Sequence, residues 1–293
     1  MPTIRIDFRL LWRVCAGFLA VFLATYAMQL LFGVGLNQLM RWLAVSPDVR
    51  TYLGSTLNRG GVLVLLVIFT ALGTKKFLGF NLFETALRRH AGWWQDLLFG
   101  LLLASGVMSV LFIVELSQGW LLFEHWGWQS DPLPVWLRSL WVSLLANLDA
   151  GLGEEVLFRG FLQNGMQKVL GKWGGLALVT VGFAAVHLTV TGSEQTNWLL
   201  FTALLSIPSF LLGYTYLRSG SLWLPVGIHF AWDLAYDVLN FTGGTHVGLF
   251  GAVTHQQGPA WIVGTEYGIE VGLAGVVVAL LIMGGVWLWT RNR

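Results

Sequence analysis

The chain consists mainly of long apolar runs separated by short polar segments. Each run approaches the ~20 residues that an α-helix needs to cross a bilayer. We predict eight membrane-spanning helices, near residues 11–34, 56–74, 96–118, 136–158, 173–191, 197–217, 223–241 and 269–290. Seven is the alternative, because Asn58, Arg59 and the pair Gly60-Gly61 interrupt the start of the second run. The first run exceeds the apolar part of a signal peptide, so we expect it to be retained.

Composition points to the same fold class. The 293 residues are 56% hydrophobic and 11% charged, whereas about a quarter of the residues in a soluble domain are charged. We therefore predict an all-α, polytopic membrane helix bundle in which about eight transmembrane helices enclose a polar cavity. The chain shows no internal repeat and no low-complexity linker, so we expect residues 1–293 to form a single integral membrane domain.

The charged residues limit the partners and predict an orientation. A net charge of +2 without a long basic block argues against nucleic-acid binding. The single cysteine, Cys15, excludes an internal disulfide and a cysteine-based zinc site. Lysines and arginines concentrate on one side of the predicted spans, which places both termini in the cytoplasm by the positive-inside rule. We expect a multi-pass protein of the plasma (inner) membrane, with the lipid bilayer as its first partner.

Three of the apolar runs carry ionisable residues. A charge near the bilayer centre costs about 2.5–3.5 kcal/mol, so we expect these residues to serve a function. On an α-helix, Glu155 and Arg159 are four residues apart and can form an ion pair. Glu154 points about 100° away from them and is left free to face a cavity. The alternative is that all three residues lie at the water interface.

The other two runs contribute imidazoles and a further carboxylate. His187 is the one ionisable residue of the fifth run, and by itself it fits a structural hydrogen bond as well as a catalytic role. His229 and Asp233 lie one helical turn apart, so the carboxylate can fix the imidazole tautomer. Intramembrane ionisable residues usually face one another or a wet cavity. We therefore predict one shared site, with Asp149 and Asp237 as candidates for its mouth.

Two chemistries fit this set of residues. A glutamate and a histidine can activate water for attack on an amide, while a second histidine stabilises the oxyanion. Alternatively, Glu154, His187 and His229 can bind a divalent metal such as zinc, which lowers the pKa of its bound water. The helical zinc-protease pattern H-E-x-x-H is absent from the sequence. The residues leave both chemistries open.

Three short motifs in this order resemble the CPBP family of intramembrane proteases, which includes type II CAAX prenyl endopeptidases and bacteriocin-processing proteins. E-E-x-x-x-R is matched by residues 154–159, F-x-x-x-H by residues 183–187, and H-x-x-x-N or D by residues 229–233. The resemblance implies a catalytic core at about 136–241. It also implies that Glu154 is the general base with His187 as its partner, and that Glu155 and Arg159 organise the cavity wall.

In the same resemblance, His229 and Asp233 form the oxyanion-stabilising or metal-ligand pair. Family members with asparagine at the position of Asp233 can donate an N–H to an oxyanion, but an ionised aspartate cannot. The aspartate would instead orient His229, bind a metal or have to stay protonated.

The expected function is an intramembrane endopeptidase, glutamate-dependent or metal-dependent, that cleaves near the C-terminus of a membrane-associated peptide or lipidated protein, such as a prenylated CAAX protein. Two alternatives remain. The first is a non-catalytic membrane scaffold or bacteriocin-immunity protein that keeps the motif residues for structure. The second is an ion-coupled transporter, although the chain lacks the repeat-related broken helices that many transporters share.

Overall fold

The structure, a computed structural model, describes residues 6–191, 198–241, 258–264 and 268–293. All of its regular elements are helices, which confirms the all-α class. They are α1 (Phe8–Trp42), α2 (Pro47–Gly73), η1 (Thr74–Leu78), α3 (Leu82–Thr85), α4 (Trp93–Ser117), α5 (Gly127–Ser130), α6 (Leu133–Leu148), η2 (Asp149–Gln163), α7 (Asn164–Thr191), α8 (Trp198–Ser219), α9 (Trp223–Leu239), α10 (Ala260–Val263), η3 (Ile269–Val271) and α11 (Leu273–Thr290).

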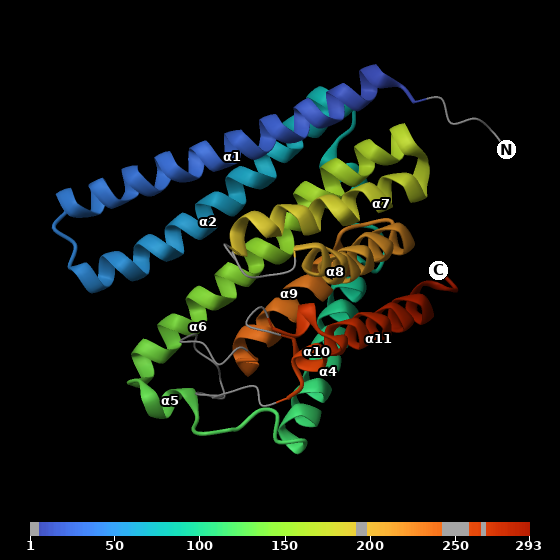
Figure 1. Ribbon diagram of the computed structural model, residues 1–293. Helices are drawn as coiled ribbons and strands as arrows, with labels where there is room; N and C mark the ends of the chain where they lie inside the picture. Colours follow the sequence, from blue (N-terminus) through green and yellow to red (C-terminus); the bar gives the residue numbers. More distant parts are fainter. Residues whose placement is uncertain (1–5, 192–197, 242–257, 265–267) are drawn as a thin grey trace.

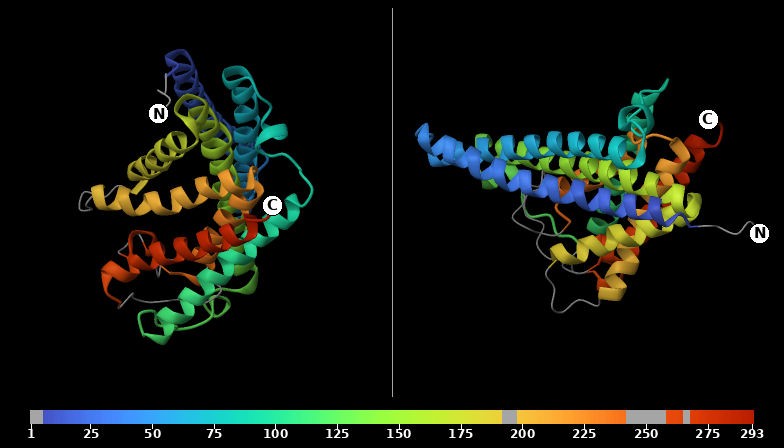
Figure 2. Two further views of the ribbon diagram at one scale, coloured as in Figure 1. Left: turned by 90° about the vertical axis from the view of Figure 1, so that its right-hand side faces the viewer. Right: turned by 90° about the horizontal axis from the view of Figure 1, so that it is seen from above.

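Helix α9 lies at the centre of the bundle. It packs against α4, α6, η2 and α8, and most of its side chains are buried. Helices α1 and α2 form a long antiparallel hairpin along one side, and α2 contacts both α6 and η2 (Figure 1). On the other side, α11 packs against α4 and α8 (Figures 1 and 2). The element η2, which carries the first motif, contacts α9 directly, whereas α7, which carries the second motif, packs against η2 and α8.

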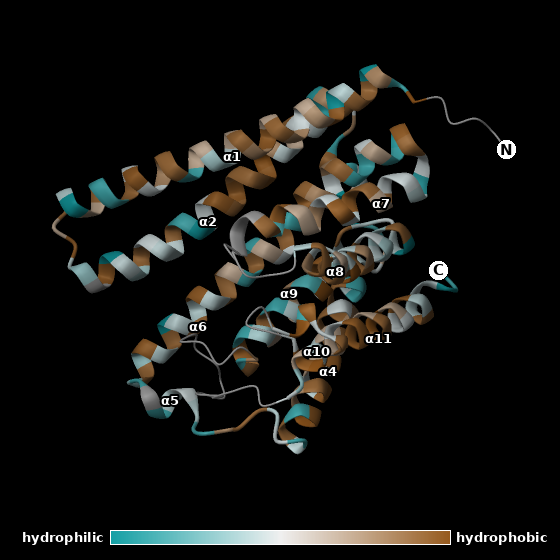
Figure 3. Cartoon of the chain, viewed as in Figure 1, coloured by the Kyte–Doolittle hydropathy of each residue, from teal (hydrophilic) through white to brown (hydrophobic). Residues whose placement is uncertain are grey.

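The outer surface is that of an integral membrane protein. Within the part of the chain that the structure describes, six helical stretches are long and apolar enough to cross a membrane: Phe8–Trp42, Val49–Leu78, Trp93–Ser117, Leu133–Leu188, Trp198–Ser219 and Leu273–Thr290. Large apolar side chains such as Leu102, Ile113 and Leu281 are more than half exposed, and hydrophobic colour covers most of the long helices (Figure 3). Lipid, rather than protein, is the natural neighbour of such surfaces.

The length and composition of the described helices identify six candidate spans rather than the predicted eight. The count of eight stays a prediction. The predicted spans 136–158 and 173–191 both overlap the single stretch Leu133–Leu188. That stretch changes direction at Gly171, whose φ of 76° and ψ of 172° are not helical. The predicted span 223–241 corresponds to α9, which has 17 residues and is therefore shorter than the 18 residues required of a membrane-spanning helix here.

Both described ends of the chain lie at the same end of the bundle (Figures 1 and 2). Cations that the sequence places together in the cytoplasm are also close in space there. Arg13 donates a hydrogen bond to the carbonyl oxygen of Lys76 at 3.5 Å, and Lys168 donates to that of Leu78 at 3.1 Å. The side of the membrane that this end faces stays a prediction.

Glycines allow the motif helices to approach closely. A Cβ atom at Gly151 of η2 would lie 2.8 Å from the backbone nitrogen and Cα of Phe230 in α9, and one at Gly100 of α4 would lie 2.6 Å from the carbonyl oxygen of Leu224. Neither contact leaves room for a methyl group. The glycine in front of the first motif therefore sets the distance between η2 and the third motif.

We expect Gly151→Ala to destabilise the protein by about 1–3 kcal/mol, because the added methyl group meets backbone that cannot move aside. Thermal unfolding in detergent measures the effect. Gly106→Ala on α4 is the matched control, since nothing lies within 4 Å of its Cβ position, and we expect it to be stabilising by about 0.5–1 kcal/mol. Equal melting temperatures for the two variants would contradict this role of Gly151.

Candidate active site

The first motif lies on an unusual helix. Residues 149–163, which include Glu154, Glu155 and Arg159, form the π-helix η2 rather than a continuous α-helix. A π-helix has i→i+5 hydrogen bonds, and such segments are frequent at functional sites. The wider turn keeps residues four and five apart on roughly the same side of the helix, so both Asp149 and Arg159 stay near the glutamate pair.

Glu155 and Arg159 form the ion pair that their spacing predicts. Nη1 of Arg159 lies 2.8 Å from Oε1 of Glu155, and both side chains are 0% exposed. Nη2 of Arg159 also donates to the backbone oxygen of Ser209 at 3.0 Å, and the guanidinium lies 4.6 Å from the centre of the Phe183 ring. The pair therefore joins η2 to α7 and α8 in the interior of the protein.

The same carboxylate holds His229. Nδ1 of His229 lies 2.9 Å from Oε1 of Glu155, so the Nδ1–H donates to the carboxylate and Nε2 faces the cavity. Asp233, which sequence reasoning gave the role of orienting His229, lies on the opposite side of the ring, with Oδ2 3.4 Å from Nε2. A buried chain of contacts thus runs from Arg159 through Glu155 to His229.

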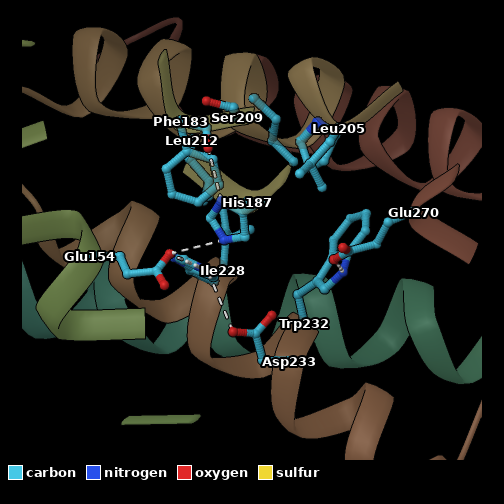
Figure 4. A pocket seen from close by; sticks show the side chains of 13 residues that line it. Glu154, Phe183, His187, Leu205, Ser209, Leu212, Ile228, Trp232, Asp233 and Glu270 are labelled. Carbon is cyan, nitrogen blue, oxygen red and sulfur yellow. Dashed lines mark hydrogen bonds and ion pairs between the residues drawn. The ribbon is translucent and has the colours of Figure 1, made fainter. Parts of the chain in front are cut away.

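Glu154 faces the two imidazoles, as Figure 4 shows for His187. Its Oε2 lies 4.0 Å from Nε2 of His187 and 3.9 Å from Nε2 of His229, and its side chain is 32% exposed. Nδ1 of His187 lies 2.8 Å from the carbonyl oxygen of Phe183. The Nδ1–H is therefore the donor, and a neutral His187 presents an unprotonated Nε2 to Glu154.

The three motifs line one cavity, which has space of about 110 Å³ for water-sized molecules. Glu154, His187, Asp233 and Glu270 reach into this space from different sides (Figure 4). Apolar side chains of α8 and α9 form much of the remaining wall: Leu205, Leu211, Leu212, Ile228 and Trp232. The arrangement combines three carboxylates, two imidazoles and an apolar surface.

Glu270 is the cavity residue that sequence reasoning missed. It comes from η3, outside the three motifs, and Nε1 of Trp232 donates to its Oε1 at 2.9 Å. A single acid at the start of an apolar run gives no periodic signal, so only the packing of η3 against α8 brings Glu270 to the site. Asp237, by contrast, accepts hydrogen bonds from Ser143 and Asn147 on α6 and does not line this cavity.

The donor atoms do not fit a zinc ion as they stand. Two ligands of one tetrahedral zinc at 2.0–2.1 Å lie about 3.4 Å apart, whereas the distances from Glu154 to the two histidines are 3.9 and 4.0 Å. Among the residues that the structure describes, no group of three or more His, Cys, Asp or Glu side chains has the arrangement of a metal site. Residues 192–197 of the predicted core 136–241 lie outside the described residues.

Comparison with known proteins agrees with the motifs. Residues 135–235 match a family model described as type II CAAX prenyl endopeptidase Rce1-like, and this segment contains all three motifs. The uncharacterized protein YpbD of Bacillus subtilis (strain 168) is 34% identical over 99 residues, which cover 34% of this chain and 46% of YpbD. The chain thus aligns with less than half of that relative's length. No solved structure matches the chain. The resemblance to the type II CAAX endopeptidases is confirmed for this segment.

Proposed function

Starting from its Rce1-like segment, residues 135–235, we propose that the protein is an intramembrane endopeptidase in which Glu154 activates water for peptide hydrolysis. The substrates are membrane-associated peptides or lipidated proteins, including prenylated CAAX-type ones, that are cut near the C-terminus. The protein acts in the plasma (inner) membrane with both termini in the cytoplasm. The six motif residues form its catalytic site within the core 136–241.

One observation carries the proposal. Oε2 of Glu154 lies 3.9–4.0 Å from the Nε2 atoms of His187 and His229. These distances are too long for direct hydrogen bonds, and they are the separations at which a water molecule bridges two polar groups. A water in this position contacts the carboxylate that is to accept its proton. It also lies inside a cavity that is large enough to admit it.

The first half of the reaction forms the new carbon–oxygen bond. Glu154 accepts a proton from the water as the oxygen attacks the carbonyl carbon of the scissile peptide. His187 holds the water through its unprotonated Nε2, because its Nδ1–H is engaged by the Phe183 carbonyl oxygen. The carbonyl oxygen becomes an oxyanion, and the partly apolar walls strengthen the electrostatic interactions that stabilise it.

The second half breaks the carbon–nitrogen bond. A protonated His229 donates from Nε2 to the oxyanion, while Glu155 accepts its Nδ1–H and stabilises the positive charge. Asp233 lies next to the same Nε2 and supports this charge instead of donating to the oxyanion. Glu154 returns its proton to the leaving nitrogen as the bond breaks. The products are a carboxylic acid and an amine, Glu154 is ionised again, and the proton of the new carboxyl group then passes to the amine or to water.

The proposal is tested by peptide cleavage in proteoliposomes, with a prenylated CAAX peptide and a panel of unprenylated membrane peptides. We expect the wild-type protein to cut at least one of them and His187→Gln to be slower by about 10²-fold, the lower end of the effect of a general acid–base group. His90→Gln is the control. His90 forms a hydrogen bond with Ser221 and does not line the cavity, so this variant should cleave at the wild-type rate.

If no peptide is cleaved while the His187→Gln protein still complements a deletion strain, the protease function is wrong. Such a result would favour a membrane scaffold that keeps the motif residues for structure.

Metal removal separates the two chemistries of the same site. We expect cleavage to persist after dialysis against a chelator, because the carboxylate and imidazole nitrogens are spaced for a bridging water rather than for zinc. The measurement compares initial rates before and after chelation and after zinc is added back. Loss of activity that zinc restores would replace the metal-free mechanism and leave the protease function standing.

A further inference from the structure

A second cavity lies on the other side of Glu154. It has space of about 360 Å³ between α1, α2 and the α6–η2 junction, and Glu154 lines both this cavity and the one that contains the two histidines. We call it the Arg59 cavity; its lining residues include Gln29 from α1, Arg59 from α2, and Asp149 from η2. Glu154 is therefore a wall residue that the two cavities share.

Arg59 is the residue that interrupts the second apolar run in the sequence, and its place in the structure gives it a use. Its side chain is half-buried and lines the cavity. It makes no hydrogen bond or close ion pair with any residue that the structure describes, although the charge of Asp149, which lines the same cavity, acts on it. A guanidinium in the membrane interior costs about 2.5–3.5 kcal/mol even on the more favourable insertion scale. This cost is offset when the cavity holds water or an anionic ligand.

The chemistry of the guanidinium identifies the ligand. Its planar fork of N–H donors matches a carboxylate in a bidentate arrangement. Every peptide with an unmodified end carries one carboxylate that does not depend on its side chains, namely its C-terminus. When a peptide bond lies at Glu154 and the chain continues into the Arg59 cavity, the fragment in that cavity ends in this group.

We propose that the Arg59 cavity is the subsite for the C-terminal leaving fragment, and that Arg59 binds the C-terminal carboxylate of the substrate. This inference rests on the proposed endopeptidase function and specifies in which orientation the substrate chain lies across Glu154. The N-terminal part of the substrate occupies the histidine side, with its apolar wall, and the fragment beyond the cut occupies the Arg59 side. Cleavage near the C-terminus follows from the position of the cation beyond Glu154.

Asp149 supports the same orientation of the substrate chain. It lines the Arg59 cavity one π-helical turn before Glu154. It makes no hydrogen bond or close ion pair with any described residue, and the charge of Arg59 attracts it across the cavity. Hydrolysis creates a new amino group at Glu154, and this group becomes an ammonium on protonation. A released fragment is then positively charged at the end near Asp149 and negatively charged at the end near Arg59, which complements the cavity.

Binding in a protein that cannot cleave tests the inference directly. In a Glu154→Gln background, two fluorescent membrane peptides are compared that differ only in a C-terminal carboxylate or carboxamide. We expect the carboxylate to bind about 10-fold to 100-fold more tightly, as for a hydrogen-bonded charge pair. Arg59→Gln should bring this ratio close to one, and Arg59→Lys, which keeps the charge but loses the fork, should retain part of it.

Arg50→Gln is the matched control. Arg50 lies on the same helix and lines a different cavity, near the α1–α2 connection, so its loss should leave the ratio unchanged. Melting temperatures establish that each variant is folded. If Arg59→Gln does not fold, Arg59→Lys is used in its place for the binding comparison. Equal binding of the two peptides to the parent protein, or an unchanged ratio in the folded Arg59 variants, overturns the inference.

Two further experiments distinguish binding of a substrate carboxylate from binding of a lipid phosphate, and the subsite from the proposed protease function. If Arg59→Gln weakens both peptides equally and only in vesicles with anionic lipid, the guanidinium binds a lipid phosphate and the inference is wrong. Cleavage of carboxylate and carboxamide peptides by the protein with Glu154 intact tests the proposed function separately. Cleavage without a preference for the carboxylate overturns only the subsite, whereas carboxylate-selective binding without cleavage overturns only the protease function.

Discussion

Glu154→Gln should abolish peptide cleavage, with a fall in kcat on the order of 10⁴-fold or more, because the glutamate serves in turn as base and as acid. Glutamine has nearly the same size and can still hydrogen-bond water, but it cannot accept a proton from it. The side chain is 32% exposed and makes no direct hydrogen bond to either histidine. We therefore expect the loss to appear in kcat, with little change in melting temperature.

Glu84→Gln is the control for this substitution. Glu84 is exposed on α3, far in sequence from the motifs, and pairs with Asn81. Progress curves for both variants are measured against the peptide that the wild type cuts best. A Glu154→Gln protein that cleaves at a rate close to wild type would exclude this residue as the general base.

Arg159→Met should be the most destabilising single substitution among the site residues. It leaves the carboxylate of Glu155 buried at 0% exposure without its arginine and with His229 as the remaining ionisable contact, and breaking a buried pair costs about 3–5 kcal/mol. It also removes the hydrogen bond to the Ser209 backbone and the contact with the Phe183 ring. Unfolding in mixed detergent micelles measures the loss, with Arg138→Met at an exposed position as the control, expected within about 0.5 kcal/mol of wild type.

The double variant Glu155→Leu/Arg159→Met separates stability from function. Replacing both charges with apolar residues removes the unpaired carboxylate, so stability should recover by several kcal/mol relative to Arg159→Met. Cleavage should not recover, because the Nδ1–H of His229 has lost its acceptor. Recovery of both properties would mean that Glu155 contributes only to packing.

Much of the site could be predicted from sequence because the signals are local. Glu155 and Arg159 are four residues apart, and that spacing on a helix brings their side chains together whatever surrounds them. His187 and Glu154 are ionisable residues in apolar runs, and the energetic cost of such residues in a membrane argues that they meet in one cavity. The structure brings all six predicted residues into one connected group.

Other features depend on which helices become neighbours. Nothing in the spacing of His229 and Asp233 indicates that the Nδ1 side of the imidazole is held by Glu155, 74 residues away. Glu270 enters the cavity from a separate element, and Arg59 approaches Glu154 from the α1–α2 hairpin. The α-helical spacing that sequence analysis used for the first motif also differs from the structure, where residues 149–163 form a π-helix.

The sequence by itself determined that this protein is an all-α membrane protein and which ionisable residues lie within its apolar segments, because hydrophobic length and the cost of charge in lipid are properties of each segment alone. Only the tertiary structure decided which carboxylate holds which imidazole, how far Glu154 stands from both histidines, and that Glu154 separates two cavities. These distances depend on helix packing, which glycines such as Gly151 and Gly100 permit through contacts between segments far apart in the chain.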